Sequence, residues 1–103
     1  MQTHAEEVKA MEGAMTALED GLKRLEHEVE RLSLSDVREW LLFYVEVSKG
    51  WSTVKDLKAM KGTMMLAIAV VGQEMNVYVG EDLRRVLKEI CAAIDLMFCI
   101  GER

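Results

Sequence analysis

The stretch VKAMEGAMTALEDGLKRLEHEVERL, residues 8–32, decides the fold, because its large apolar residues recur at alternating spacings of three and four. This is the a and d pattern of a heptad repeat, which places one apolar stripe along a single α-helix. The sequence therefore predicts a long N-terminal helix over about residues 5–32. Its stripe consists of Val8, Met11, Met15, Leu18, Leu22, Leu25, Val29 and Leu32.

The residues beside this stripe favour a bundle over a two-stranded coiled coil. Ala10, Ala14, Ala17 and Gly21 lie next to the d positions, where their small size lets a second helix approach. The e and g positions carry mainly glutamate, so a parallel homodimer of this helix would gain no attractive e–g pair. Gly13 and Gly21 each cost about 1 kcal/mol of helix stability relative to alanine, so a packing reason is expected for them.

Two further helices are predicted from apolar periodicity and terminal signals. One covers about residues 36–49 and ends at Lys49 and Gly50, a basic residue followed by glycine, as is common at helix C-termini. The other runs from about Asp82 to Ile100 and begins just after Gly80. The connections between helices are short, which predicts that neighbouring helices are antiparallel.

The segment GTMMLAIAVVG, residues 62–72, contains eight consecutive apolar residues and permits two interpretations. From Val54 onward, apolar residues keep the three and four spacing, which favours a helix. Leu66, Ile68 and Val70 also alternate with alanine, as a β-hairpin over residues 64–79 would require. The helix explains a longer stretch, and methionine, leucine and alanine favour it.

A helix over this segment is apolar on every side, so it has to be surrounded by other elements. It is too short to cross a bilayer, which needs about 20 apolar residues. The N-terminal helix, about 42 Å long, also exceeds the roughly 34 Å diameter of a compact domain of this size. Both features predict a homo-oligomer, most simply a two-fold dimer. The expected interface residues are Met11, Met15, Leu18, Leu22, Leu25, Val29, Leu66, Ile68 and Val70.

Composition places limits on the class of protein. The 103 residues are 50 % hydrophobic, which is typical of a single folded domain over residues 1–103, with packed helices over about 36–103. The net charge of −5 disfavours non-specific binding of nucleic acid. Cys91 and Cys99 are eight residues apart, about 12 Å along a helix and too far for a disulfide. With no signal peptide apparent, we expect two reduced thiols in a cytoplasmic protein.

Residues with catalytic or metal-binding chemistry are sparse. His4 is near the N-terminus, and His27 occupies the outermost heptad position among glutamates. No histidine follows a glutamate by three residues, as di-iron bundles require, and no glycine-rich phosphate loop is found. We therefore expect no enzyme activity, no cofactor and no metal. Lys49, Lys55, Lys58 and Lys61 form a basic strip that we expect to lie along a glutamate-rich N-terminal helix of the same chain or of a neighbour.

The sequence thus predicts an all-α bundle of three or four helices that forms a homo-oligomer. The expected function is non-enzymatic, namely self-assembly or binding of another protein through helical faces. One alternative is a regulator that contacts nucleic acid, or an enzyme acting on it, through the lysine strip or the acidic face. A second alternative is a small helical-bundle enzyme that depends on a metal.

Overall fold

The computed structural model describes residues 3–32, 35–74 and 77–101, and these residues form four helices. They are α1 (His4–Glu30), α2 (Ser35–Lys49), α3 (Val54–Glu74) and α4 (Val77–Gly101). The described residues contain no β-strand, so the all-α prediction is confirmed. Within residues 64–79, the described positions are helical, which excludes the hairpin alternative for them.

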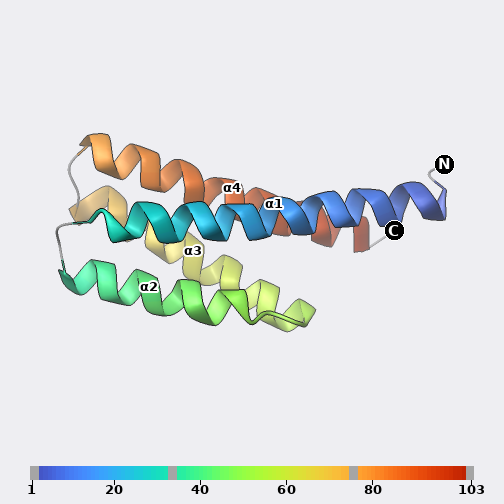
Figure 1. The fold of residues 1–103 in the computed structure, drawn as a ribbon, viewed down its shortest axis with the longest axis horizontal. Coiled ribbons are helices and arrows are strands. Elements are labelled where there is room, and N and C mark those ends of the chain that lie inside the picture. The colour runs from blue at the N-terminus through green and yellow to red at the C-terminus, as the bar shows by residue number, and fades with distance from the viewer. Residues whose placement is uncertain (1–2, 33–34, 75–76, 102–103) are drawn as a thin grey trace.

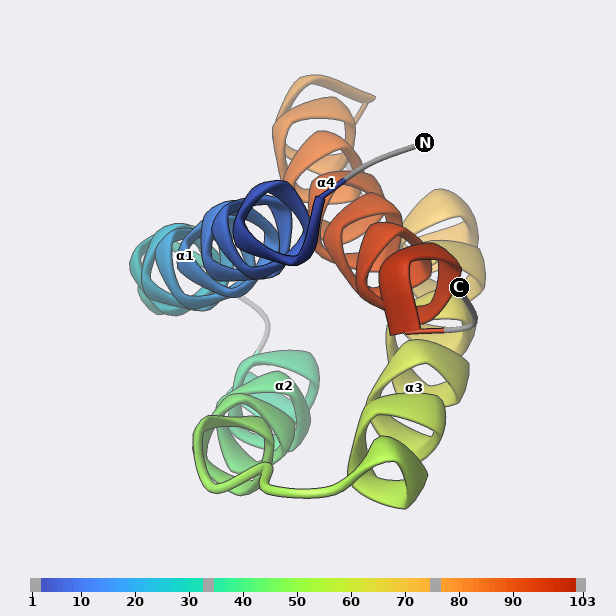
Figure 2. The same cartoon turned by 90° about the vertical axis from the view of Figure 1, so that its right-hand side faces the viewer.

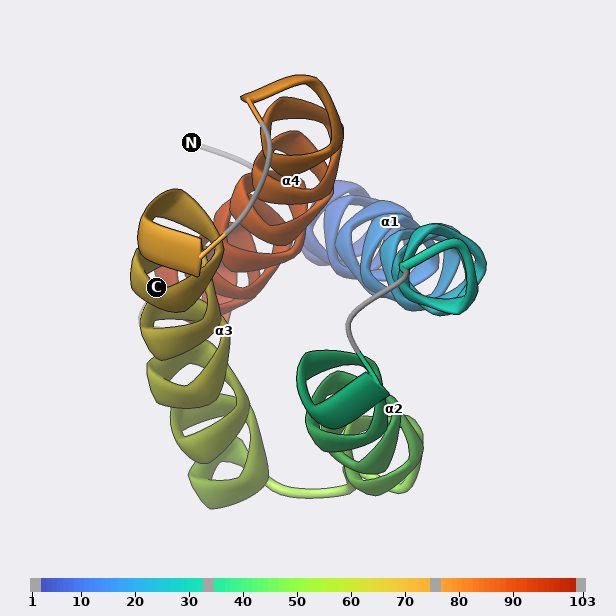
Figure 3. The ribbon, with the colours of Figure 1, turned by 90° about the vertical axis from the view of Figure 1, so that its left-hand side faces the viewer.

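The helices form an elongated up-and-down bundle with extents of 47 × 24 × 19 Å, in which consecutive helices run antiparallel (Figure 1). Helix α1 packs most extensively against α4, α4 also packs against α3, and α1 also packs against α2. Helices α2 and α3 make far fewer contacts with each other. Views along the bundle show the resulting arc, from α2 through α1 and α4 to α3 (Figures 2 and 3). Three pairs of neighbouring helices are therefore well packed, and the fourth pair, α2 and α3, is packed loosely.

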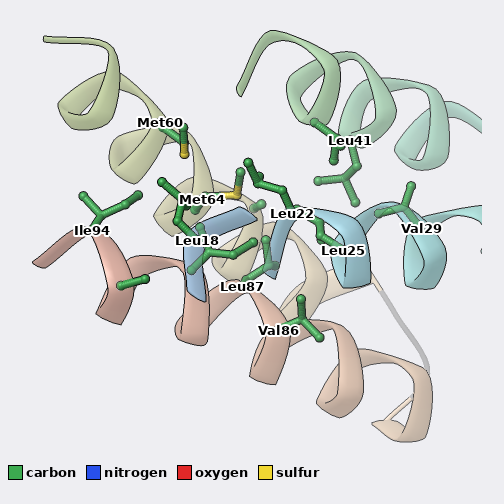
Figure 4. Close-up of a cluster of buried hydrophobic side chains, with 14 of the residues drawn as sticks. Leu18, Leu22, Leu25, Val29, Leu41, Met60, Met64, Val86, Leu87 and Ile94 are labelled. Carbon is green, nitrogen blue, oxygen red and sulfur yellow. The ribbon is translucent and has the colours of Figure 1, made fainter. Parts of the chain in front are cut away.

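Helix α1 is fixed at both ends by backbone hydrogen bonding. Thr3 and Glu6 form a reciprocal capping box, in which each side chain accepts a hydrogen bond from the other residue's backbone N–H. The helix ends at Glu30, two residues before the expected end, and the Arg31 N–H donates to carbonyls of the last turn. Between these ends, the second half of the predicted stripe is fully buried in the core (Figure 4).

The close contact between α1 and α4 explains the small residues of α1 in part. Ala14 and Gly21 are buried, and a Cβ atom added at Gly21 would lie 2.8 Å from the Cγ1 atom of Ile90. Glycine at position 21 thus allows the side chain of Ile90 to lie against the backbone of α1. Ala17 is exposed, and a Cβ atom at Gly13 would have nothing within 4 Å. The described residues therefore provide no packing reason for Gly13.

Helix α3 buries a face that is rotated from the predicted one and shares Leu57 and Met64 with it. Its buried residues are Leu57, Met60, Met64 and Ala67. Val54, an expected a position, is exposed instead, and Lys61 at the next a position forms an ion pair with Asp95 of α4. The apolar residues of α3 satisfy more than one spacing pattern, because its second half is an uninterrupted apolar run over residues 64–71. The position of α4 then selects which face is buried.

Helix α4 begins at Val77, five residues before the predicted start at Asp82. Gly80, interpreted from sequence as the boundary, lies inside the helix. A glycine inside a helix costs only about 1 kcal/mol, which packing readily outweighs. The packing here is extensive, since Leu83, Leu87, Ile90 and Ile94 are all fully buried.

Candidate interaction surfaces

The outer face of α3 carries large apolar side chains that the described residues leave uncovered. At its centre lie Met65 and Leu66, which are 57 % and 56 % exposed. Gly62 and Ala69 flank them and are also exposed, and a Cβ atom at Gly62 would have nothing within 4 Å. These four residues, here called the α3 face, point away from α4 because Met64 and Ala67 occupy the buried side.

The predicted interface residues fall into three groups. Leu18, Leu22, Leu25 and Val29 are buried in the core of the same chain, which accounts for their apolar character without a second copy. Met11, Met15, Ile68 and Val70 are partly buried. Leu66 remains largely exposed. Its neighbour Met65 was missed in the sequence, although it belongs to the same apolar run.

The order of residue sizes along the α3 face is symmetric. Gly62 and Ala69 are equally far from the midpoint between Met65 and Leu66, so the face reads small, large, large, small in both directions. In a two-fold pair of antiparallel helices, each copy presents the same residues in reverse order. A symmetric order therefore places the small residues of one copy opposite the small residues of the other. This symmetry is the sequence signal that identifies Gly62, Met65 and Ala69.

Charge is distributed unevenly along α3. Lys55 and Lys58 are exposed near its start, and among the described residues neither forms an ion pair. The helix ends at Glu74, and its last turn contains no basic residue. The first turn also contains Asp56, but Lys55 and Lys58 outnumber it. Since the C-terminal end of a helix also carries partial negative charge, α3 is net positive near its start and negative at its end.

The other two lysines of the predicted strip are held within the chain. Lys49 forms ion pairs with Glu26 of α1 and with Glu46, and hydrogen bonds to these carboxylates raise the pKa of the Lys49 ammonium group. Lys61 pairs with Asp95 of α4 rather than with α1. Two of the four lysines therefore contact acidic residues of the same chain. Only one of them, Lys49, contacts the N-terminal helix as predicted.

The open side between α2 and α3 carries aromatic residues. Trp40 and Phe43 each make an edge-to-face contact with Tyr44 of α2, at ring-centroid distances of 5.3 and 5.5 Å. Phe43 and Val47 are largely exposed. Tyr44 and Val47 line a groove of about 370 Å³, whose opposite wall is formed by α3.

The described residues provide little for catalysis. They contain no cluster of three or more histidine, cysteine or acidic side chains that would hold a metal ion. His4 and His27 are both exposed. None of the described helices combines the length and apolar character needed to cross a bilayer.

Comparison with protein-family models, with curated proteins and with solved structures finds no match for this chain. Its function is therefore inferred from the surfaces described above.

Proposed function

We propose that this protein is a self-assembling helical-bundle module whose copies pair through the α3 face in an antiparallel, two-fold dimer. The observation that carries the proposal is the exposure of Met65 and Leu66, two large apolar residues adjacent in sequence near the middle of α3. Large apolar side chains gain about 1.5–3 kcal/mol each when they are fully buried. A second copy would cover both residues on each chain with one contact.

The symmetry of the α3 face supports a second copy as the occupant. An antiparallel pair centred between Met65 and Leu66 places Gly62 opposite Ala69 of the other copy. Residues this small let two helix backbones approach closely while the central Met65 and Leu66 side chains pack around the axis.

Charge supports the antiparallel direction. In such a pair, Lys55 and Lys58 of each chain lie near the C-terminal end of the partner's α3, which carries Glu74 and the negative end of the helix dipole. A parallel pair would instead bring the lysines of the two copies together. Exposed charges contribute only a few tenths of a kcal/mol to about 1 kcal/mol each, so they set direction more than affinity.

The proposal is tested by measuring molar mass with light scattering on a sizing column, from micromolar to near-millimolar concentration. The protein is expected to approach twice its chain mass of 11.7 kDa. Leu66→Asp is expected to give a folded monomer, because Leu66 is 56 % exposed in the single chain and aspartate there remains in contact with water. Circular dichroism verifies that the variant is folded.

Leu96→Asp is the matched control. Leu96 lies on α4 and is 49 % exposed, so this variant makes the same chemical change at a similar exposure on another helix. It is expected to leave the dimer intact. A protein that stays monomeric throughout the series, or equal effects of the two aspartate variants, would contradict the proposal.

Gly62→Leu tests the close approach of the helices separately. In the single chain this position has open space around it, and leucine favours helix over glycine by somewhat less than 1 kcal/mol. The variant monomer is therefore expected to be at least as stable as the original. The dimer is expected to weaken, because the larger side chain separates the two backbones. An unchanged dimer would show that Gly62 is not at the contact.

A further inference from the structure

One end of the bundle is left open by a mismatch in helix length. Helix α2 has 15 residues, whereas α1 has 27 and α4 has 25. At 1.5 Å per residue, α2 is about 22 Å long and α1 about 40 Å. Figure 1 shows α1 and α4 continuing beyond the end of α2, toward the end of the bundle where the chain starts and finishes. There, the apolar stripe of α1 has no α2 to cover it.

The uncovered stripe forms one wall of a recess of about 410 Å³. This volume falls within the roughly 300–1,000 Å³ of small-molecule sites. This cavity is here called the end recess. Its apolar lining comes from three helices and from the segment that joins α2 to α3. Its main residues are Met11, Met15, Trp51, Leu57, Met97 and Phe98.

Among the residues that the structure describes, a single charged residue lines the end recess. It is Lys58, near the start of α3, and it is exposed and forms no ion pair with the described residues. The remaining polar lining consists of Ser52 and Thr53, which also cap the start of α3. A site with an apolar body and one cation at its edge complements a ligand with an apolar body and one anionic end.

We propose that the end recess binds a single-chain aliphatic carboxylate, with the hydrocarbon chain among the methionines and aromatic rings and the carboxylate at the Lys58 ammonium group. Methionine side chains are flexible and polarisable, so they adapt to a chain without a fixed shape. The site is separate from the proposed dimer contact and has only Lys58 in common with the charged surroundings of the α3 face. Binding is therefore expected in the monomeric Leu66→Asp variant as well as in the original protein.

Trp51 provides a direct readout of binding. Trp51 lines the recess and also the groove between α2 and α3, whereas the other tryptophan, Trp40, lines neither. The Trp40→Phe variant therefore follows Trp51 alone, and the recess-filling variant described below assigns the signal to the recess. Adding decanoate below its micellar concentration is expected to change the fluorescence of Trp51 in a saturable way, with one ligand per chain. Affinity is expected to rise about fourfold per methylene from hexanoate to decanoate, which corresponds to about 0.8 kcal/mol per buried methylene.

Charge recognition is tested by exchanging charges on both partners. Lys58→Glu is expected to weaken decanoate binding and to strengthen binding of decylammonium, while decanol binds both proteins equally. The expected change is about two- to fivefold for each charged ligand, since the ammonium group is exposed. If decanoate and decanol respond identically to Lys58→Glu, the recess does not recognise a carboxylate and the proposal is wrong.

The location is tested by filling the recess. Gly101 lines it at the end of α4, and a Cβ atom there would have nothing within 4 Å, so a larger side chain has room without moving the backbone. Gly101→Leu is expected to weaken decanoate binding at least tenfold while leaving the thermal unfolding midpoint unchanged. Unchanged affinity in this variant, or no saturable change at Trp51 in the unfilled protein, would overturn the proposal.

Discussion

Two glycines in the same helix are expected to respond in opposite ways to the same substitution. In α1, Gly13 is surrounded by open space, whereas a Cβ atom at Gly21 would lie 2.8 Å from Ile90 Cγ1. Replacing glycine by alanine inside a helix stabilises it by about 1 kcal/mol. Gly13→Ala is therefore expected to raise the free energy of unfolding by that amount, which corresponds to roughly 4–8 °C in the unfolding midpoint.

Gly21→Ala gains the same helix propensity, but its added methyl group clashes with the side chain of Ile90. Adding a methyl group to a packed contact costs about 1–3 kcal/mol, so the variant is expected to range from unchanged to about 2 kcal/mol less stable. Both variants gain the same helix propensity, so this contribution cancels when their free energies of unfolding are compared. That difference, about 1–3 kcal/mol, measures the closeness of the α1–α4 contact. Thermal and urea unfolding at one protein concentration provide the assay.

A double-mutant cycle identifies the atom responsible. Ile90→Ala removes Cγ1 at a cost of about 2–5 kcal/mol by itself. In that background, Gly21→Ala is expected to become stabilising, as Gly13→Ala is in the original protein. If Gly21→Ala raises the unfolding midpoint as much as Gly13→Ala without any change at Ile90, then α1 and α4 do not approach as closely as the structure shows.

Two further predictions follow from titratable groups. The backbone N–H groups of Ser52 and Thr53 donate to the Asp56 carboxylate and hold its pKa below the ordinary value of 3.8, so its stabilising effect is present above that pH and lost as the pH falls below it. Asp56→Asn is accordingly expected to be less stable than the original protein at neutral pH, with a difference that shrinks below about pH 4 in urea unfolding, and a gap independent of pH would contradict this. Burial raises the pKa of the Cys91 thiol, and the nearby Asp95 raises it further, whereas Cys99 is exposed. Alkylation at pH 8 followed by peptide mass spectrometry is expected to modify Cys99 first, and equal rates at both cysteines would show that Cys91 is not protected.

The helical class was predictable because α1 satisfies one pattern and no other. Its alternating spacing agrees with charged outer positions, and the structure buries Leu18, Leu22, Leu25 and Val29 accordingly. Helix α3 was predictable as an element but not in its orientation. The uninterrupted apolar run over residues 64–71 fits several faces, and the segment before it mixes apolar residues with lysines. The spacing alone therefore did not show that Met60 and Ala67 are buried while Val54 is exposed.

The candidate sites were less predictable, because they depend on how helices of unequal length align. The sequence identified Leu66 as unusual for its outward position and Met11 and Met15 as part of a stripe. It did not indicate that Trp51 and Phe98 meet those methionines at one end of the bundle. Contacts between residues so distant in sequence arise from packing, which local periodicity does not encode.

The pairing of the first helix with the last also has a consequence for synthesis on the ribosome. Helix α1 makes its most extensive contact with α4, and the side of α1 that carries Ala14 and Gly21 is covered by that contact. A nascent chain can form the α1–α2 hairpin early, but this side of α1 has to wait until α4 has left the exit tunnel. During that interval the apolar surface is open to chaperones and to other nascent chains. Slowing translation between α3 and α4 would prolong this exposure and increase the fraction of chains that aggregate.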